Sequence, residues 1–326
     1  MQITILGAGT WGIALGQVLI DNDLDVSIWH YKKDYIDELN NERFHSKLNI
    51  NISDKIDLIS DSRQISPSSL ILICLPSQSV RETLSFLNLK NQSYINASKG
   101  IELESGKLIS DIIKETTIAS DDTIACISGP SHAEELVKRI PTVIAVASAN
   151  DAFSKSIQKS FSNNYFRLYR SESIEAMQVG GAVKNIISIA AGICEGLGYG
   201  DNTIAALITR GVQEIIRFCT LYTTKTDLLL GISGIGDLIV TSTSGHSRNK
   251  KIGMLIGKGR NLSESLSNMN MVVEGVETTR SVYMMAAKHN ISMPICNEVY
   301  NILFKDKKPR EAINDLMLRD LTKESL

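Results

Sequence analysis

The chain has 326 residues, 21% of them charged, and a formal net charge of -2. This balance gives no reason to expect a nucleic-acid partner or binding to a membrane surface, and the length suits two domains with large cores. The five cysteines are scattered, without Cys-x-x-Cys or Cys/His metal spacing, which favours reduced thiols in a cytoplasmic protein and no metal site.

The chain begins directly with a strand pattern, without the basic region and cleavage site of a signal peptide. The apolar run Ile3–Leu6 leads into GAGTWG and then into an apolar helical pattern over Ile13–Ile20. This order predicts a dinucleotide-binding turn, with a glycine-rich turn that holds no ligand as the alternative. Gly7 would permit the tight turn, Gly9 would let the backbone approach a pyrophosphate, and Gly12 would let helix and strand pack closely.

A second strand is predicted over Asp25–Trp29, and the residues His-Tyr-Lys-Lys follow it at 30–33. Folds specific for NAD usually carry an acid here for the ribose 2′-hydroxyl, but the first acid after this strand is Asp34. The missing carboxylate and the two lysines favour NADP(H), or use of both cofactors, over strict NAD. A solvated charged loop is the alternative.

Later apolar runs predict further strands at 70–76, 94–97, 124–127, 142–147 and 165–169. Polar loops follow several of these strands, at the sheet edge where open α/β folds bind ligands. Lys99 lies in one such loop, where it points into a crevice or simply into solvent. Residues Ser128–Ala133 offer backbone N–H groups and hydroxyls in another loop, which a plain turn would also explain. The first domain is therefore expected to end near residue 175.

Almost only helical patterns follow, for example at 205–222, 251–256 and 277–288. We expect an α/β fold with an N-terminal Rossmann-type NAD(P)-binding domain at residues 1–175. An all-helical C-terminal domain for substrate binding and catalysis is expected at residues 176–326. No apolar run approaches the roughly 20 residues that a membrane span needs, so no membrane span is expected.

Lys184 is the only charged residue between Glu175 and Glu195, in an apolar pattern that predicts a helix buried on most sides. Burial would disfavour the charged amine and move its pKa toward neutrality, where a lysine can donate and accept protons. The alternative is a lysine that snorkels to solvent from a helix end.

Two stretches of the helical half indicate chemistry. Residues 231–237 form a glycine-dense turn that ends in the carboxylate of Asp237. Residues 241–250 combine hydroxyls, an arginine and an amide just before a helix, which favours a phosphate site. An N-cap at Ser247 with a polar flank is the alternative.

Together these sequences resemble the bacterial NAD(P)-dependent glycerol-3-phosphate dehydrogenase family over nearly the whole chain. The sequences that carry the resemblance, in chain order, are GAGTWG, ASKG at 97–100, SGPSHAEE at 128–135, GGAVKN at 180–185, LITRG at 207–211, GISGIGDL at 231–238, SRN at 247–249 and VVEG at 272–275. One departure is His132, at a position where the family usually has an aromatic residue such as phenylalanine.

The resemblance implies that Lys184 is the proton donor and acceptor, held by Asp237, and that Lys99 stabilises developing charge. It implies a substrate site made of Lys99, Gly129, Ser131, Lys184, Asp237, Ser247, Arg248 and Asn249, with Arg248 and Asn249 on the phosphate. It implies cofactor contacts from Thr10, Trp11, Tyr31, Lys99, Ala133, Arg248, Val272 and Glu274, beside the three glycines of the first turn.

The implied reaction is the reversible reduction of dihydroxyacetone phosphate to sn-glycerol 3-phosphate, which would supply glycerophospholipid synthesis. One alternative is another two-domain dehydrogenase that acts on a hydroxy acid, since a cationic, hydroxyl-rich site would also hold a carboxylate. A second is a nucleotide-sensing protein that has lost catalysis, which need not keep Lys184, Asp237 and Arg248 together. The apolar surface expected of the helices allows a homodimer.

Overall fold

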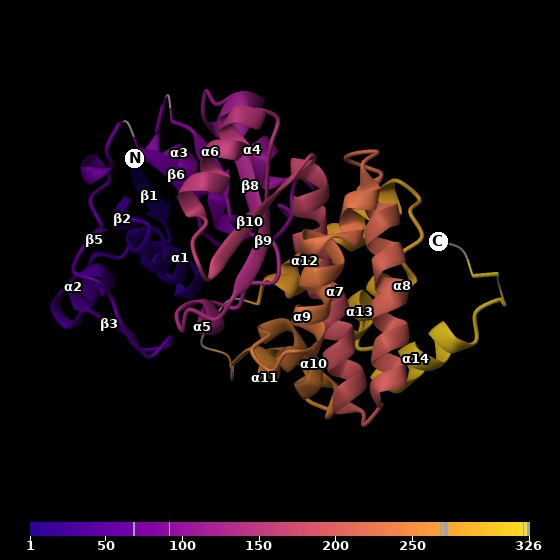
Figure 1. Cartoon of the computed structure of the whole chain (residues 1–326). Coiled ribbons are helices and arrows are strands. Elements are labelled where there is room, and N and C mark those ends of the chain that lie inside the picture. Colours follow the sequence, from indigo (N-terminus) through magenta and orange to yellow (C-terminus); the bar gives the residue numbers. More distant parts are fainter. Residues whose placement is uncertain (68, 91, 268, 270–272, 322, 325–326) are drawn as a thin grey trace. The chain divides into compact units, whose positions relative to one another are not determined.

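The computed structural model describes residues 1–67, 69–90, 92–267, 269, 273–321 and 323–324 (Figure 1). These residues divide into two compact units. The first unit comprises Met1–Ser98 and Ile109–Ile174, and the second comprises Lys99–Leu108 and Glu175–Leu326. The two functional domains expected at 1–175 and 176–326 remain a prediction.

The first unit is built on an eight-stranded sheet in the order β10-β9-β8-β7-β6-β1-β2-β5. Its neighbouring strands run parallel except for β8 and β9, which are antiparallel. The strands are β1 Gln2–Leu6, β2 Asp25–Trp29, β5 Ile56–Ile59, β6 Leu70–Ile73, β7 Tyr94–Asn96, β8 Ile124–Ser128, β9 Thr142–Ser148 and β10 Phe166–Ser171, with a separate hairpin of β3 Phe44–His45 and β4 Ile50–Asn51. The predicted strands are confirmed, whereas β5 and the hairpin were not predicted.

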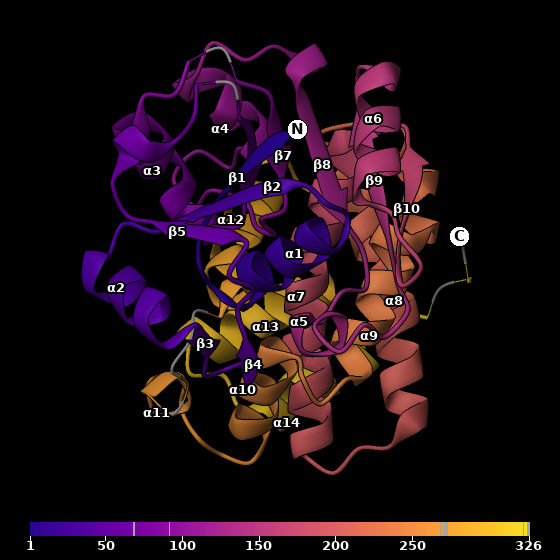
Figure 2. The same ribbon diagram turned by 60° about the vertical axis from the view of Figure 1, so that its left-hand side comes forward.

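Helices pack on this sheet and complete the Rossmann-type unit (Figure 2). Helix α1 packs on β1, β2 and β5, where Ile3, Ile5 and Ile28 are fully buried, and α6 packs on β9 and β10. The helices are α1 Thr10–Asp21, α2 Lys33–Glu42, α3 Val80–Leu87, α4 Ile109–Thr116, α5 Ala133–Leu136 and α6 Asp151–Phe161. The packing of α1 thus fixes the positions of β1 and β2, whose carboxyl ends lead into the glycine turn and into the loop after Trp29.

The regular elements described in the second unit are helices, as the sequence predicts. They are α7 Ile174–Gly196, α8 Asp201–Cys219, α9 Asp237–Thr243, α10 Arg248–Gly257, α11 Leu262–Ser267, α12 Glu274–Lys288, α13 Pro294–Phe304 and α14 Pro309–Met317. A π-helical turn at Ile232–Gly236 leads directly into α9. The segment Lys99–Leu108 joins this unit, where Ser281 donates a hydrogen bond to Ile101 O at 3.2 Å and Tyr222 donates one to Gly106 O at 2.9 Å.

Helix α7 lies buried in the core of the second unit. With 23 residues and a mean hydropathy of 1.3 it is long and apolar enough to cross a membrane, so the expectation that no run approaches that length was wrong. Its apolar stretch is nevertheless 100% buried inside the protein. Val183, Ile186 and Ile187 have no exposed surface. Such complete burial is that of a core helix, and the charge of Lys184 lies within it.

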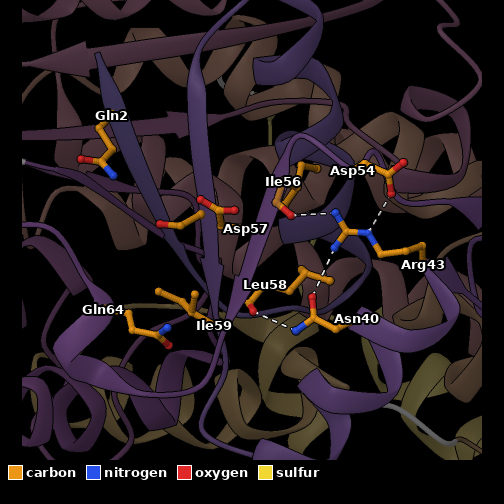
Figure 3. Close-up of a pocket in the computed structure, with 10 residues that line it drawn as sticks. Gln2, Asn40, Arg43, Asp54, Ile56, Asp57, Leu58, Ile59 and Gln64 are labelled. Atoms are coloured by element: carbon orange, nitrogen blue, oxygen red, sulfur yellow. Dashed lines mark hydrogen bonds and ion pairs between the residues drawn. The ribbon is translucent and has the colours of Figure 1, made fainter.

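A polar hollow of about 690 Å³ lies along the edge strand β5 in the first unit (Figure 3). Its lining includes Gln2, Asp57 and Gln64. Arg43 spans one side, where its guanidinium donates hydrogen bonds to Asn40 Oδ1 and Ile56 O and pairs with Asp54. The hollow is lined by none of the candidate site residues.

Candidate active site

The amine of Lys184 lies inside the second unit, and only 4% of the residue surface is exposed. Its Nζ donates hydrogen bonds to Asp237 Oδ1 and to Thr241 Oγ1, the latter at 2.6 Å. Asp237 is 1% exposed, and its second oxygen, Oδ2, accepts a hydrogen bond from Lys99 Nζ at 2.7 Å. The carboxylate therefore bridges two lysines, and the alternative of a lysine that snorkels to solvent is wrong.

The local sequence explains how Asp237 and Thr241 come to face the same lysine. Asp237 is the first residue of α9, where the helix dipole favours a negative charge. Thr241 follows one turn later on the same face, and its hydroxyl donates to Asp237 O at 2.6 Å. The glycine-rich turn before α9 is tightly packed, because a Cβ at Gly234 would lie 1.9 Å from Leu229 O. This turn therefore places Asp237, at the start of α9, beside Lys184 in the middle of α7.

The electrostatics of this group favour a titratable amine. Burial lowers the pKa of Lys184 to about 7, with Asp237 raising it and the positive charge of Lys99 lowering it further. For Asp237, burial raises the pKa, but the attraction of Lys184 and Lys99 outweighs it and leaves that pKa below its ordinary value. A lysine that titrates near neutrality, beside an ionised carboxylate, is equipped to give and take a proton.

The start of α10 carries the predicted SRN sequence. Ser247 is the N-cap, and its Oγ accepts a hydrogen bond from Lys250 N at 3.2 Å, as the capping alternative predicts. Arg248 is the first residue of the helix and is exposed. Asn249 is buried, with Nδ2 bonded to Asn185 Oδ1 at 2.9 Å and Oδ1 bonded to Gly275 N at 3.0 Å. A capped helix start beside an arginine remains suited to an anion.

In the first unit, the G-x-G-x-x-G sequence joins β1 to α1 as predicted. Gly7 has φ +116°, and a Cβ there would lie 2.6 Å from Cys74 O, so another residue would not fit. A Cβ at Gly12 would lie 2.0 Å from Gly7 O, which explains the close packing of helix and turn. A Cβ at Gly9 would meet no atom within 4 Å, so this backbone is accessible to a ligand. Thr10 and Trp11 open the helix.

The end of β2 is an aromatic and basic loop. The rings of His30 and Tyr31 stack at 4.8 Å, and Lys32 Nζ lies 5.7 Å from the centre of the Tyr31 ring. Lys33 pairs with Asp37 one turn along α2. Tyr31 is 67% exposed, so the loop presents an aromatic face and positive charge to solvent. The Lys33 side chain is thus paired with a carboxylate, whereas the side-chain contact shown for Lys32 is with the Tyr31 ring.

The remaining predicted residues lie at element ends. In the first unit, Ser131 Oγ donates to Gly129 O at 2.9 Å in the loop after β8, and Ala133 begins α5 directly after His132. In the second unit, Glu274 begins α12. Val272 lies outside the described residues. The second unit brings together Lys99, Lys184 and Asp237, whereas the dinucleotide turn belongs to the first.

Three polar residues near the Lys184–Asp237 pair were not predicted as site residues. Thr241 contacts the lysine directly, and its spacing of four from Asp237 was the available signal. Asn185 and Ser188 belong to α7 itself. Their proximity to Lys184 in sequence was visible, but their partners were not.

A dinucleotide-binding turn in one unit and a buried lysine–carboxylate pair in the other are features of a nicotinamide-dependent dehydrogenase. Residues 2–154 match the family description "NAD-dependent glycerol-3-phosphate dehydrogenase N-terminus", and residues 174–314 match the corresponding C-terminus. The chain therefore belongs to the NAD-dependent glycerol-3-phosphate dehydrogenase family and is an oxidoreductase.

Individual relatives agree with this assignment. The chain is 42% identical over 323 residues to glycerol-3-phosphate dehydrogenase [NAD(P)+] of Oceanobacillus iheyensis, covering 98% of this chain and 94% of the relative. It is 41% identical to the enzyme of the same name from Staphylococcus aureus, with 99% of each chain covered. The crystal structure of glycerol-3-phosphate dehydrogenase from Coxiella burnetii superposes with a TM-score of 0.92 at 32% identity, over 98% of this chain and 99% of that one.

Proposed function

We propose that Lys184 is the proton donor and acceptor in the reversible, NAD(P)H-dependent reduction of dihydroxyacetone phosphate to sn-glycerol 3-phosphate. The observation that carries this proposal is the buried amine, whose pKa is lowered to about 7 and which is bonded to Asp237. The direct test is to measure oxidation of NADPH and NADH by the purified protein with dihydroxyacetone phosphate. A small 2-keto acid, which a dehydrogenase acting on hydroxy acids would reduce, serves as the negative control substrate.

The residues of the first unit fit a nicotinamide dinucleotide. The backbone at Gly9 is accessible, and the start of α1 offers N–H groups that favour a pyrophosphate. We propose that Gly7, Gly9, Thr10, Trp11, Gly12, Tyr31, Ala133 and Glu274 contact the cofactor, with Lys99 and Arg248 near both ligands. When bound, the nicotinamide supplies or accepts the hydride.

The hydrogen bonds of Lys184 define what its amine can do. A protonated lysine has three N–H donors, and Asp237 Oδ1 and Thr241 Oγ1 take two of them. The third is left for the oxygen of the substrate carbonyl, which gains a proton as it becomes the alcohol. In the oxidation direction the neutral amine offers a lone pair at the same place. Lys99, bonded to the other carboxylate oxygen, adds positive charge where the substrate oxygen becomes negative.

We propose that the start of α10 binds the phosphate. The first N–H groups of a helix lack partners within the helix and carry partial positive charge. Arg248 adds a guanidinium, which binds phosphate in a bidentate manner. The amide of Asn249 already makes two hydrogen bonds within the protein, so it contributes at most its remaining N–H. Gly129 and Ser131 complete the proposed substrate contacts from the first unit.

Replacing Arg248 with alanine is expected to raise KM for dihydroxyacetone phosphate while changing kcat much less, because a phosphate contact exists in the ground and transition states alike. A lost charge-assisted hydrogen bond costs about 1.5–3 kcal/mol, which corresponds to a rise of roughly tenfold to a hundredfold. Steady-state kinetics measure both constants. Arg260→Ala, an exposed arginine beyond the end of α10, is the control. An unchanged substrate KM in Arg248→Ala would move the phosphate site elsewhere.

NADPH is expected to be used at least as well as NADH, because the end of β2 lacks the carboxylate that would repel a 2′-phosphate. The double variant Lys32→Ala/Lys33→Ala should raise KM for NADPH and leave KM for NADH nearly unchanged. The effect should weaken at high ionic strength, since exposed charges are screened. Lys155→Ala is a matched control, because this exposed lysine pairs with an aspartate four residues away, as Lys33 does. Equal losses for both cofactors would argue against a 2′-phosphate contact.

The rates of the two directions should depend on pH in opposite ways. Burial lowers the pKa of Lys184 from 10.5 to about 7, so the amine changes protonation within the usual assay range. Reduction needs the protonated amine, and its kcat should therefore be constant in acid and fall as pH rises through about 7. Oxidation of glycerol 3-phosphate needs the neutral amine and should rise through the same midpoint. Parallel pH profiles for both directions would contradict this role.

Several broader properties are part of this proposal. A cytoplasmic location is supported by the free thiols at all five cysteines, and the product suits glycerophospholipid synthesis.

A homodimer without a nucleic-acid partner is proposed, and light scattering coupled to size-exclusion chromatography measures the oligomeric state directly. The division into a cofactor domain at 1–175 and a catalytic domain at 176–326 is supported by the two compact units, except at Lys99–Leu108.

A further inference from the structure

Ser188 lies on α7 one turn beyond Lys184 and has no exposed surface. Its hydroxyl donates a hydrogen bond to Thr241 O at 2.7 Å and lies 3.0 Å from Ser247 Oγ. Thr241 is the residue whose own hydroxyl accepts a hydrogen bond from the Lys184 amine. Ser247 is the N-cap of α10, directly before Arg248. One buried hydroxyl therefore joins the helix of the proton donor to both neighbouring helices of the proposed site.

Counting hydrogens fixes the direction of these bonds. A serine hydroxyl has a single hydrogen, and that of Ser188 goes to the backbone carbonyl of Thr241. The hydrogen between the two serines must then come from Ser247. The Ser247 oxygen also accepts from Lys250 N, so this hydroxyl caps the helix and points its hydrogen at Ser188. Ser247 is thus held as a cap by Ser188, directly before Arg248, which is exposed.

The packing of α7 against α10 shows why this bond matters. A Cβ at Gly192 would lie 2.0 Å from Lys250 O, and a Cβ at Gly253 would lie 2.1 Å from Ile189 O. The two helices therefore touch backbone to backbone on the side of Ser188 that is farther from Lys184. Backbone contact fixes the helix spacing there up to Lys250, the third residue of α10, and Asn249 Nδ2 donates a hydrogen bond to Asn185 Oδ1 of α7 at 2.9 Å. The bond between Ser188 and Ser247 extends these contacts to the N-cap itself, the residue directly before Arg248.

We infer that Ser188 is a positioning residue, which holds the start of α10 at a set distance from the Lys184 amine. The groups that bind the phosphate and the carbonyl of the substrate are thereby held at a fixed distance from each other. This inference rests on the proposed function of Lys184 and α10. It adds a residue that touches neither the substrate nor the cofactor and acts through Ser247.

Ser188→Ala removes the acceptor of the Ser247 hydroxyl and the donor to Thr241 O. KM for dihydroxyacetone phosphate is expected to rise roughly threefold to tenfold, the range for the loss of a neutral hydrogen bond, while KM for the nicotinamide cofactor stays at the wild-type value. The pH midpoint of reduction should not move, because the partners of the Lys184 amine remain. Ser188→Cys, with a weaker donor of similar shape, should give an intermediate KM. This variant replaces Ser188→Ala in the test if the alanine variant does not fold.

A double-mutant cycle with Ser247→Ala separates positioning from general stability. If Ser188 acts through Ser247, the effect of Ser188→Ala on substrate KM should disappear in the Ser247→Ala background. Ser265→Ala is the control, because Ser265 is also fully buried and donates its hydroxyl to a backbone carbonyl, Asn261 O, at 2.8 Å. It should lower Tm without changing substrate KM.

Wild-type substrate KM in a folded Ser188 variant, or additive effects in the cycle, would overturn the inference. Those outcomes leave the proposed function standing, since the wild-type protein would still reduce dihydroxyacetone phosphate. A wild-type protein inactive on this substrate would instead overturn the proposed function and the inference with it.

Discussion

Replacing Lys184 with methionine is expected to lower kcat for dihydroxyacetone phosphate reduction by roughly 10²–10⁴-fold, the usual cost of losing a positioned general acid. Methionine fills much of the buried space of the lysine side chain but has no proton to give. Asp237 would keep the Lys99 amine at 2.7 Å, so its carboxylate would not be left without a cation. The Kd of NADPH, measured by fluorescence titration, should stay near the wild-type value because the dinucleotide turn belongs to the first unit.

The control for this variant is Lys288→Ala, an exposed lysine in the last turn of α12. Its kcat should equal that of the wild-type protein. A Lys184→Met enzyme with kcat within a few-fold of wild type would end the assignment of this lysine as the proton donor. The residual rate should also lose the pH dependence that the amine provides.

Asp237→Asn is expected to affect both activity and stability. Burial and Lys99 lower the pKa of Lys184, and Asp237 is the group that raises it, so removing the carboxylate should move this pKa further down. Each unit of that shift lowers the protonated fraction above the midpoint about tenfold, so reduction at neutral pH should fall roughly tenfold to a hundredfold. Breaking a buried ion pair also costs about 3–5 kcal/mol of folding free energy, measured by urea unfolding.

The pH profile distinguishes this role from a purely structural one. The midpoint for reduction should move to lower pH, and part of the lost rate should return in acid. Asp227→Asn, at an exposed aspartate in the turn before α9, is the control and should keep both the midpoint and the stability. An Asp237→Asn enzyme with a wild-type midpoint would show that the carboxylate does not set the protonation of Lys184.

The sequence predicted the parts of the fold that depend on local patterns. The glycine turn and the strand Asp25–Trp29 were predicted because apolar runs and turn residues mark them unambiguously. Strand β5 was missed because Asp57 interrupts a run of only four residues, Ile56–Ile59. The antiparallel pairing of β8 with β9 was not predictable, because it depends on chain direction and long-range register rather than on either strand alone.

The candidate site divides in the same way. Lys184 was recognisable as an isolated charge in an apolar helix, and its burial and lowered pKa are confirmed. The glycine-dense turn before Asp237 was also recognisable, and the family resemblance implied the contact of Asp237 with Lys184. The bond from Lys184 to Thr241 crosses more than 50 residues of sequence and was not predicted. The partners of Ser188 and Asn249 were equally hidden, since a buried hydroxyl or amide reveals its role only through the helices packed around it.

The segment Lys99–Leu108 has a consequence for how this protein can be divided or recombined. The chain leaves the first unit after Ser98, contributes ten residues to the second, and returns at Ile109. A fragment cut near residue 175 would separate Asp237 from Lys99, one of its two cations, and would remove the loop that Tyr222 binds. The two units are therefore not interchangeable modules. Chimaeras between relatives keep this ion pair matched only if Lys99–Leu108 is exchanged together with the helical unit.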